Sequence, residues 1–122
     1  MPLLLPLAAC TSGLKRPVVS AEARPDARGV QRVVIRMHSF YFEPNRIVVH
    51  AGRPVELVLK NSGKLIPHNF TVADSALALS QGAWLRTGHL TFTPQAPGEH
   101  EFFCHVDGHA KKGMTGTLVV VP

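Results

Sequence analysis

The sequence predicts an all-β fold, a Greek-key β-sandwich or barrel of roughly seven or eight strands. Three observations support this prediction. From Val30 onward, short runs rich in Val, Ile, Leu and Phe alternate with turn residues over about 90 residues. Apolar side chains recur at every second position in the clearest of these runs. No long apolar pattern with helical spacing competes with them. A segment of this length suits one domain with a modest core.

The expected strands follow one another along the chain, each closed by a turn signal. Val30–Met37 has β-branched residues at its centre, and Pro54–Lys60 alternates so that one face should be buried. Pro and Gly mark the turns between strands, as at Pro94–Gly98. Residues 76–85 are expected to form a short helical turn or an irregular loop. The expected strands are 30–37, 40–42, 46–50, 54–60, 68–73, 89–93, 99–104 and 117–121.

The residues before this domain have a different composition. Residues 1–9 are wholly apolar, too short for a membrane span of about 20 residues and typical of the apolar part of a secretory signal. The tetrad Leu7-Ala8-Ala9-Cys10 resembles the lipobox of bacterial lipoproteins, which implies cleavage before Cys10 and a lipid on it. No Lys or Arg precedes the apolar run, so a disordered apolar N-terminus is the alternative. Residues 10–29 are predicted to be a flexible tether to a domain at 30–122, in the bacterial periplasm or cell envelope.

Charge and cysteine content exclude several classes of function. The net charge of +5 is spread along the chain, without the clustered basic face that nucleic-acid binding requires. The two cysteines, Cys10 and Cys104, lie in very different settings, and a disulfide between them would consume a thiolate that the chemistry below requires. We therefore expect a monomer that binds no nucleic acid and meets the membrane only through a lipid on Cys10.

The most informative segment is residues 102–116, which places Cys104, His109 and Met114 at intervals of five residues. Soft sulfur ligands select copper, zinc or iron–sulfur clusters, and two imidazoles with one thiolate and a weak axial Met are typical of a copper site for electron transfer. His68, in Ile-Pro-His-Asn-Phe, is the candidate for the second imidazole. Gly108 and Gly113 should let the loop curl, because glycine tolerates unusual backbone angles.

The spacing Cys-x₄-His-x₄-Met, followed by Gly-x-Leu and preceded by the His-Asn at His68, resembles the cupredoxins, the small type 1 copper proteins. The resemblance covers residues 32–121. It implies one copper ion cycling between Cu(I) and Cu(II), with His68, Cys104 and His109 as equatorial ligands and Met114 as the axial ligand. It also implies that the backbone amide of Asn69 donates to the thiolate and that the Asn69 side chain braces the ligand loop.

Multinuclear copper sites do not fit this chain. Cys104-His105 resembles part of a multicopper oxidase motif, but Phe103 stands before the cysteine where a second His is needed, and the chain has no His-x-His pair. A binuclear centre requires a second Cys in the loop. The remaining histidines lack a Cys or Met at ligand spacing and are expected at the surface or at strand edges, namely His38, His50, His89 and His100.

The function expected from these features is one-electron transfer between redox proteins such as a cytochrome, an oxidase or a reductase, without enzymatic activity. The resemblance implies that electrons pass through an exposed edge of His109. Lys111 and Lys112 beside it predict an acidic docking face on the partner. The alternative is copper binding and delivery at the cell envelope. A catalytic domain, such as a fragment of a nitrite reductase, would need a second copper site.

Overall fold

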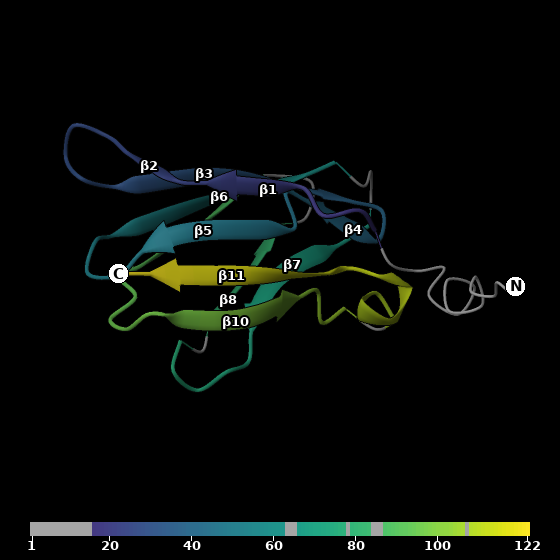
Figure 1. Cartoon of the computed structure of the whole chain (residues 1–122). Helices are drawn as coiled ribbons and strands as arrows, with labels where there is room; N and C mark the ends of the chain where they lie inside the picture. The colour runs from purple at the N-terminus through teal and green to yellow at the C-terminus, as the bar shows by residue number, and fades with distance from the viewer. Residues whose placement is uncertain (1–15, 63–65, 78, 84–86, 107) are drawn as a thin grey trace, which may run out of the picture.

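The fold is a sandwich of two β-sheets in a computed structural model that describes residues 16–62, 66–77, 79–83, 87–106 and 108–122 (Figure 1). This confirms the predicted all-β class. A single 3-10 helix, η1, spans Ala110–Lys112 within the described residues. The strands are β1 (Ser20–Glu22), β2 (Arg24–Pro25), β3 (Gln31–His38), β4 (Tyr41–Glu43), β5 (Arg46–His50), β6 (Val55–Asn61), β7 (His68–Val72), β8 (Leu79–Ala83), β9 (Thr87–Phe92), β10 (Gly98–Phe103) and β11 (Thr115–Val121).

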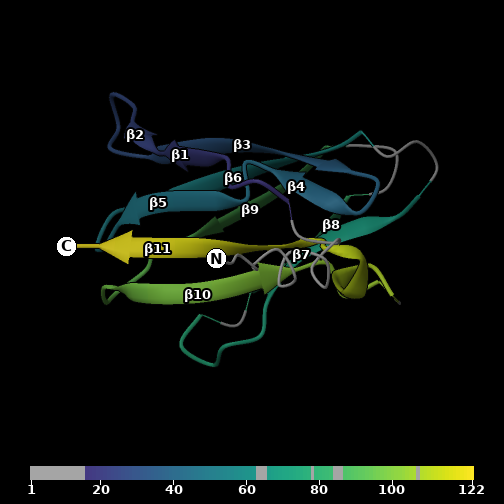
Figure 2. The ribbon, with the colours of Figure 1, turned by 45° about the vertical axis from the view of Figure 1, so that its right-hand side comes forward.

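The order of the strands brings distant parts of the sequence together (Figure 2). The first sheet has the order β1-β5-β11-β10-β7-β8, and the second has the order β2-β3-β6-β9 with β4 paired to β3. Strands β10 and β11 are antiparallel, and β10 meets β7 at the pair Phe103–Thr71. The end of β10 therefore lies between β7 and the start of β11, although β7 is some 30 residues before β10 in the sequence.

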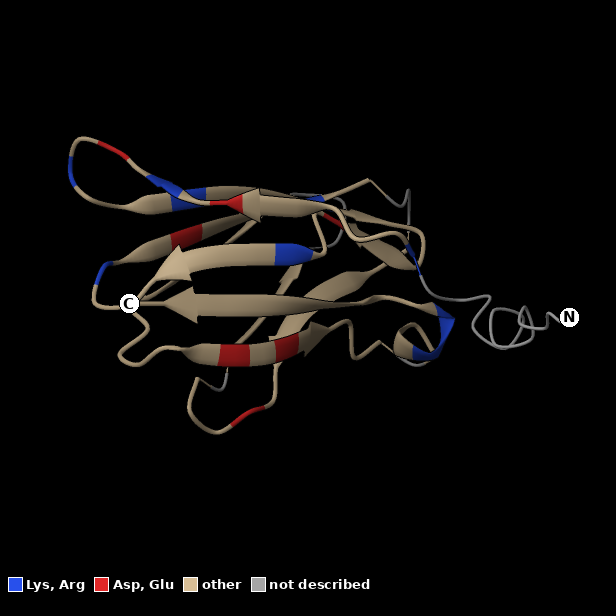
Figure 3. Cartoon of the chain, viewed as in Figure 1, with Lys and Arg blue, Asp and Glu red and all other residues tan. Residues whose placement is uncertain are grey.

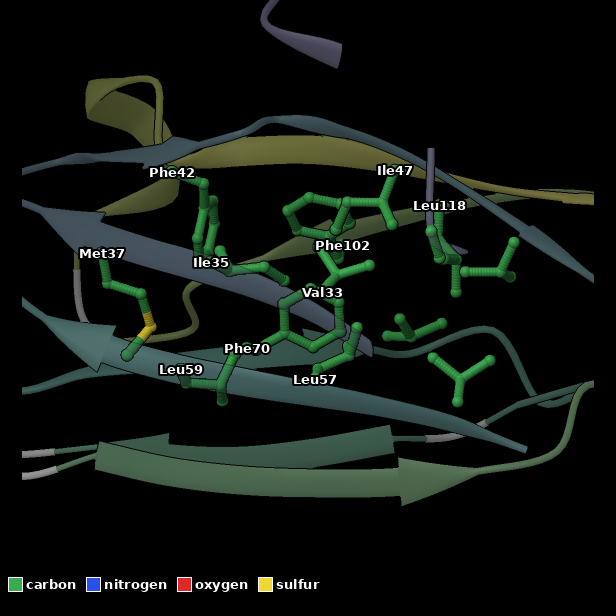
Figure 4. Packing of buried hydrophobic residues seen from close by; sticks show 14 of the residues in the cluster. Val33, Ile35, Met37, Phe42, Ile47, Leu57, Leu59, Phe70, Phe102 and Leu118 are labelled. Carbon is green, nitrogen blue, oxygen red and sulfur yellow. The ribbon is translucent and has the colours of Figure 1, made fainter. Parts of the chain in front are cut away.

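The core lies between the sheets and has the alternation expected from the sequence. Strand β3 alternates buried and exposed positions along most of its length, and β6 buries Val55, Leu57 and Leu59 completely. The rings of Phe42, Phe70 and Phe102 pack together at the centre, with centroids 4.5–6.1 Å apart (Figure 4). Phe70 and Phe102 each lie two residues from a predicted copper ligand and on the same strand face, so this packing holds both ligand positions.

The structure differs from the prediction before Val30. Strand β1 lies in the predicted tether, yet it pairs in parallel with β5, and the N–H of Ala23 donates to the carbonyl of Val48 at 2.9 Å. Ala23 is buried in the core. The sheet therefore begins about ten residues before the predicted boundary at Val30. A short edge strand has no alternating apolar pattern, so the sequence does not reveal it.

Strand β8 is the second difference, because it occupies part of the segment predicted as a helical turn or loop. Its residues are mostly small or polar, and its conformation is fixed by pairing with β7 in the register Phe70–Gln81. The hydroxyls of Thr71 and Ser80 are 3.1 Å apart across this pair. Tertiary pairing, rather than local propensity, determines this strand.

One end of the sandwich carries η1, and the C-terminus lies at the opposite end in both views (Figures 1 and 2). Two positive residues, Lys111 and Lys112, lie on η1, and two negative residues, Glu99 and Glu101, lie on β10 (Figure 3). Among the described residues, no helix has the length and apolar character needed to cross a membrane.

Candidate metal centre

Three of the four predicted ligands meet at the end of the sandwich that carries η1. His68 is the first residue of β7, Cys104 directly follows β10, and His109 is the N-cap of η1. All three are buried, and their candidate ligand atoms lie within 4.8 Å of one another. The two imidazole rings are 5.0 Å apart between centroids.

The loop between β10 and β11 is closed by its own backbone. The N–H of Cys104 donates to the carbonyl of Met114 at 3.1 Å, which continues the antiparallel pairing beyond Phe103–Thr115. The carbonyl of His109 accepts from the N–H groups of Lys112 and Met114, so η1 folds back on the ligand. Gly108 and Gly113 have φ of 78° and 99°, which confirms the expected role of glycine in this loop.

The separation of the donors fits a metal ion. The Sγ of Cys104 lies 3.4 Å from Nδ1 of His109 and 4.0 Å from Nδ1 of His68. A metal such as zinc lies about 2.0 Å from imidazole nitrogen and about 2.3 Å from thiolate sulfur, so trigonal ligands would be about 3.5–3.7 Å apart. The observed distances bracket that range. Two imidazoles, a thiolate and an adjacent thioether residue are the donor set that favours copper.

Burial sets the protonation of the site without metal. Loss of solvation, with smaller repulsion from His109 and His38, lowers the pKa of His68 to about 4. Its buried Nε2 has no hydrogen-bond partner among the described residues, so nothing there stabilises an imidazolium. Burial also raises the pKa of the Cys104 thiol, against the opposing effect of N–H groups from Asn69 and Val106. At neutral pH His68 is ready to bind metal, whereas Cys104 must first lose a proton.

Asn69 has the position expected of it. Its backbone N–H donates to Sγ of Cys104 at 3.4 Å, and its side-chain Oδ1 accepts from the N–H of His105 at 2.8 Å. The Thr71 hydroxyl donates to the same Oδ1 at 3.1 Å and fixes the orientation of the amide. One residue thus contacts the sulfur and also braces the loop after it.

Met114 is fully buried directly before β11, one residue beyond Gly113. Its N–H donates to the carbonyl of His109 at 3.2 Å, which ties it to the ligand loop through the backbone. This location is compatible with the fourth donor position, and its role as axial ligand remains a prediction.

His109 differs from the expectation of an exposed electron-transfer edge, because the residue is only 8% exposed. The ring of Phe40 packs against it in a T-shaped contact, with centroids 4.9 Å apart. Sequence reasoning missed Phe40, which it assigned to a strand-forming apolar cluster. Nothing in the local pattern shows that this residue turns toward a loop about 70 residues away.

The other histidines have separate roles. His100 is buried, contrary to expectation, and its Nδ1 lies 2.7 Å from Oδ2 of Asp74. His38 stacks on Tyr41 and contacts Glu43, and His89 is exposed beside Glu56. His105 is exposed and contributes its backbone N–H to Asn69. In the described part of the chain, His68, Cys104 and His109 are the one cluster with metal-binding geometry.

Comparisons with known proteins agree with this fold. The model of the Cupredoxin-like domain family matches residues 5–120. A relative from Pseudomonas aeruginosa, named a copper-resistant cuproprotein, is 29% identical and is aligned over 84% of this chain and 81% of its own length. Auracyanin A, a blue copper protein of Chloroflexus aurantiacus, has a TM-score of 0.66 at 24% identity, covering 75% of this chain and 99% of its own. The metal-binding domain of a Streptococcus pneumoniae Cu(I)-exporting ATPase has a TM-score of 0.67 at 20% identity, covering 88% of this chain and 100% of that domain.

Proposed function

Because the chain belongs to the cupredoxin-like family, we propose that it binds one copper ion in the cell envelope and serves in copper resistance. The observation that carries this proposal is the buried His68–Cys104–His109 cluster, whose donors are already at metal-binding distances. The copper-resistant cuproprotein of Pseudomonas aeruginosa supports the biological role. The protein acts as a binding protein and not as an enzyme.

Each donor has a distinct part in binding. His68 offers a neutral imidazole, because burial lowers its pKa to about 4. Cys104 releases its proton when the metal binds, and the Asn69 N–H stabilises the resulting sulfur charge. His109 would close the site from the loop, and Met114 would offer a thioether as a fourth, weaker donor. Bound copper supplies a one-electron couple, and the buried surroundings keep water away from it.

The binding test uses the full chain and its Cys104→Ser variant. We expect one equivalent of copper per chain, with an intense visible thiolate-to-copper band from the Cu(II) form. The variant should lose that band and most of its affinity, since serine oxygen is a poor soft ligand. Failure of the unaltered chain to bind copper would contradict the proposal.

The biological role has its own test. A strain that lacks this protein should grow poorly at elevated copper, and expression of the unaltered chain should restore growth. Expression of Cys104→Ser to the same level should not restore it. Full rescue by the variant would show that copper resistance does not depend on this site.

Electron transfer is the second candidate, and the rigidity of the site favours it. Hydrogen bonds hold Cys104, His105 and His109 in place without metal, so copper could change oxidation state with little rearrangement. Lys111 and Lys112 are exposed beside the site and would attract an acidic redox partner such as a cytochrome, oxidase or reductase. Lys111→Glu should then slow electron exchange with that partner, most strongly at low salt. For a protein that only stores copper, Lys111→Glu would have no salt-dependent effect on electron exchange.

The envelope location rests on the N-terminal sequence. We propose that Leu7-Ala8-Ala9-Cys10 directs lipid attachment to Cys10 and that the domain reaches the periplasm. Labelling with a radioactive fatty acid should mark the unaltered chain and not Cys10→Ser. Equal labelling of both chains, or of neither, would exclude a lipid on this cysteine.

A further inference from the structure

Phe40 occupies a backbone conformation that its side chain disfavours. His38 pairs with Tyr41 across β3 and β4, which leaves Ser39 and Phe40 as a two-residue turn. Phe40 has φ of 72°, and it is the one residue other than glycine with positive φ in the described part of the chain. Glycine or asparagine normally takes such a position, and a bulky residue there strains the backbone.

The strained conformation directs the Phe40 ring onto the metal centre. The ring meets the imidazole of His109 at 4.9 Å with an interplanar angle of 77°. The Nζ of Lys112 lies over the same ring, 4.3 Å from its centroid. Phe40 therefore joins the β3–β4 turn to both ends of η1, since His109 precedes that helix and Lys112 ends it.

These contacts contribute to the burial of a ligand on a surface loop. His109 is 8% exposed, although Gly108 before it and Lys111 after it are exposed. Sγ of Cys104 lies only 3.4 Å from the imidazole that Phe40 covers. The Phe40 ring thus contacts the imidazole that lies next to the sulfur.

We propose that Phe40 is a cover on the metal centre that limits how fast metal and small reagents reach Cys104 and His109. The part of this inference that concerns copper rests on the proposed function. It predicts the rate at which copper enters and leaves the site as well as the affinity for copper. The cover holds copper against loss to small competitors, so a protein acceptor would have to displace the Phe40 ring to take the metal. Lys112 is a positioning residue that acts through its contact with the ring.

The test compares Phe40→Gly with Phe40→Tyr in the full chain. Glycine removes the ring and suits the positive φ, so the turn should keep its shape, and relief of the backbone strain should offset the lost ring contacts. Tyrosine keeps the ring and is the matched control. Phe40→Asn, which also tolerates this conformation, provides a second ring-free variant if the glycine variant folds poorly.

The first measurement needs no metal: alkylation of the Cys104 peptide by a thiol reagent, followed by mass spectrometry. We expect the ring-free variants to react at least about fivefold faster, equivalent to about 1 kcal/mol, and Phe40→Tyr to react as the unaltered chain does. Unfolding by urea, measured in parallel, must show no loss of stability that could account for the faster reaction. Equal alkylation rates in a folded ring-free variant would overturn the proposal.

The second measurement is the rate of copper transfer to a Cu(I) chelator. The ring-free variants should lose copper at least about fivefold faster, and Lys112→Gln should show a smaller increase in the same direction. An unchanged rate of copper release from the ring-free variants would also overturn the proposal that Phe40 covers the metal centre. If the unaltered chain binds no copper, the proposed function fails, while the alkylation experiment still decides whether Phe40 covers Cys104.

Discussion

The backbone N–H of Asn69 donates to the sulfur of Cys104 at 3.4 Å, which joins two residues 35 positions apart in the sequence. The contact exists because β7 lies beside β10 in the first sheet. The Asn69 side chain extends the link to the next residue, through the His105 N–H at 2.8 Å. The scaffold therefore holds the sulfur and the start of the ligand loop through one residue.

Replacement of Asn69 should separate these two roles. Asn69→Ala keeps the backbone N–H to sulfur but removes Oδ1, so the His105 amide should exchange its hydrogen faster. The lost side-chain hydrogen bonds should lower the free energy of unfolding by about 1–2 kcal/mol. Hydrogen-exchange mass spectrometry and urea unfolding measure both effects. Asn69→Asp keeps an acceptor and should retain His105 protection; equal protection in Asn69→Ala would show that the side chain does not brace the loop.

Met114 provides a test of the axial position. Met114→Leu nearly preserves side-chain volume, so the free energy of unfolding should fall by less than about 1.5 kcal/mol. Copper should still bind through the three stronger donors, and its reduction potential should rise, because loss of the thioether destabilises Cu(II) more than Cu(I). Voltammetry measures the shift. Met37→Leu, in the same buried cluster on β3, is the control and should leave the potential unchanged; a shift no larger for Met114→Leu would remove Met114 from the ligand set.

Much of this site could be predicted because its residues follow a fixed spacing on strand ends. Cys104 and His109 are close in sequence, and His68 begins a strand with clear β character. Phe40 could not be predicted, since its role depends on a turn conformation and a contact made only in the folded chain. The buried His100 was missed for a similar reason. Its partner, Asp74, follows a different strand, and no local pattern pairs the two residues.

The same limitation applies to edge strands. β1 and β8 are held by neighbours in the first sheet, β5 and β7, and neither has an apolar alternation of its own. Interior strands such as β6 bury every second side chain, and this leaves a period that can be recognised in the sequence.

Gly116 should be intolerant of a side chain. It lies opposite Phe102 in the β10–β11 pair, and a Cβ there would overlap the Phe102 ring and lie 2.5 Å from the backbone oxygen of Asn45. Because a backbone atom cannot easily move, Gly116→Ala should lower the free energy of unfolding by about 1–3 kcal/mol. Gly82→Ala is the matched control, since its Cβ would lie 3.8 Å from the nearest atom. Equal urea midpoints for the two variants would contradict the predicted overlap.

Acid should destabilise the metal-free protein through His68 before it affects the paired carboxylates. Burial lowers the pKa of His68 from 6.5 to about 4, so the unfolded chain binds more protons than the folded chain between these values. The contribution of His68 to the free energy of unfolding should be constant above about pH 7.5. As the pH drops to about 4, this contribution should fall by about 2–3 kcal/mol. Asp26, Asp74 and Glu56 have lowered pKa values, so their contributions are lost mainly at lower pH.

Urea unfolding of the metal-free chain between pH 7.5 and 4.5 tests this effect against His68→Gln, which cannot titrate at that position. The unaltered chain should lose more stability over this range than the variant, because the other titrating groups are common to both. Copper should reduce the loss, since the ion competes with the proton for His68 and stabilises the folded state. The same pH dependence in the two metal-free chains would mean that His68 is not the group responsible.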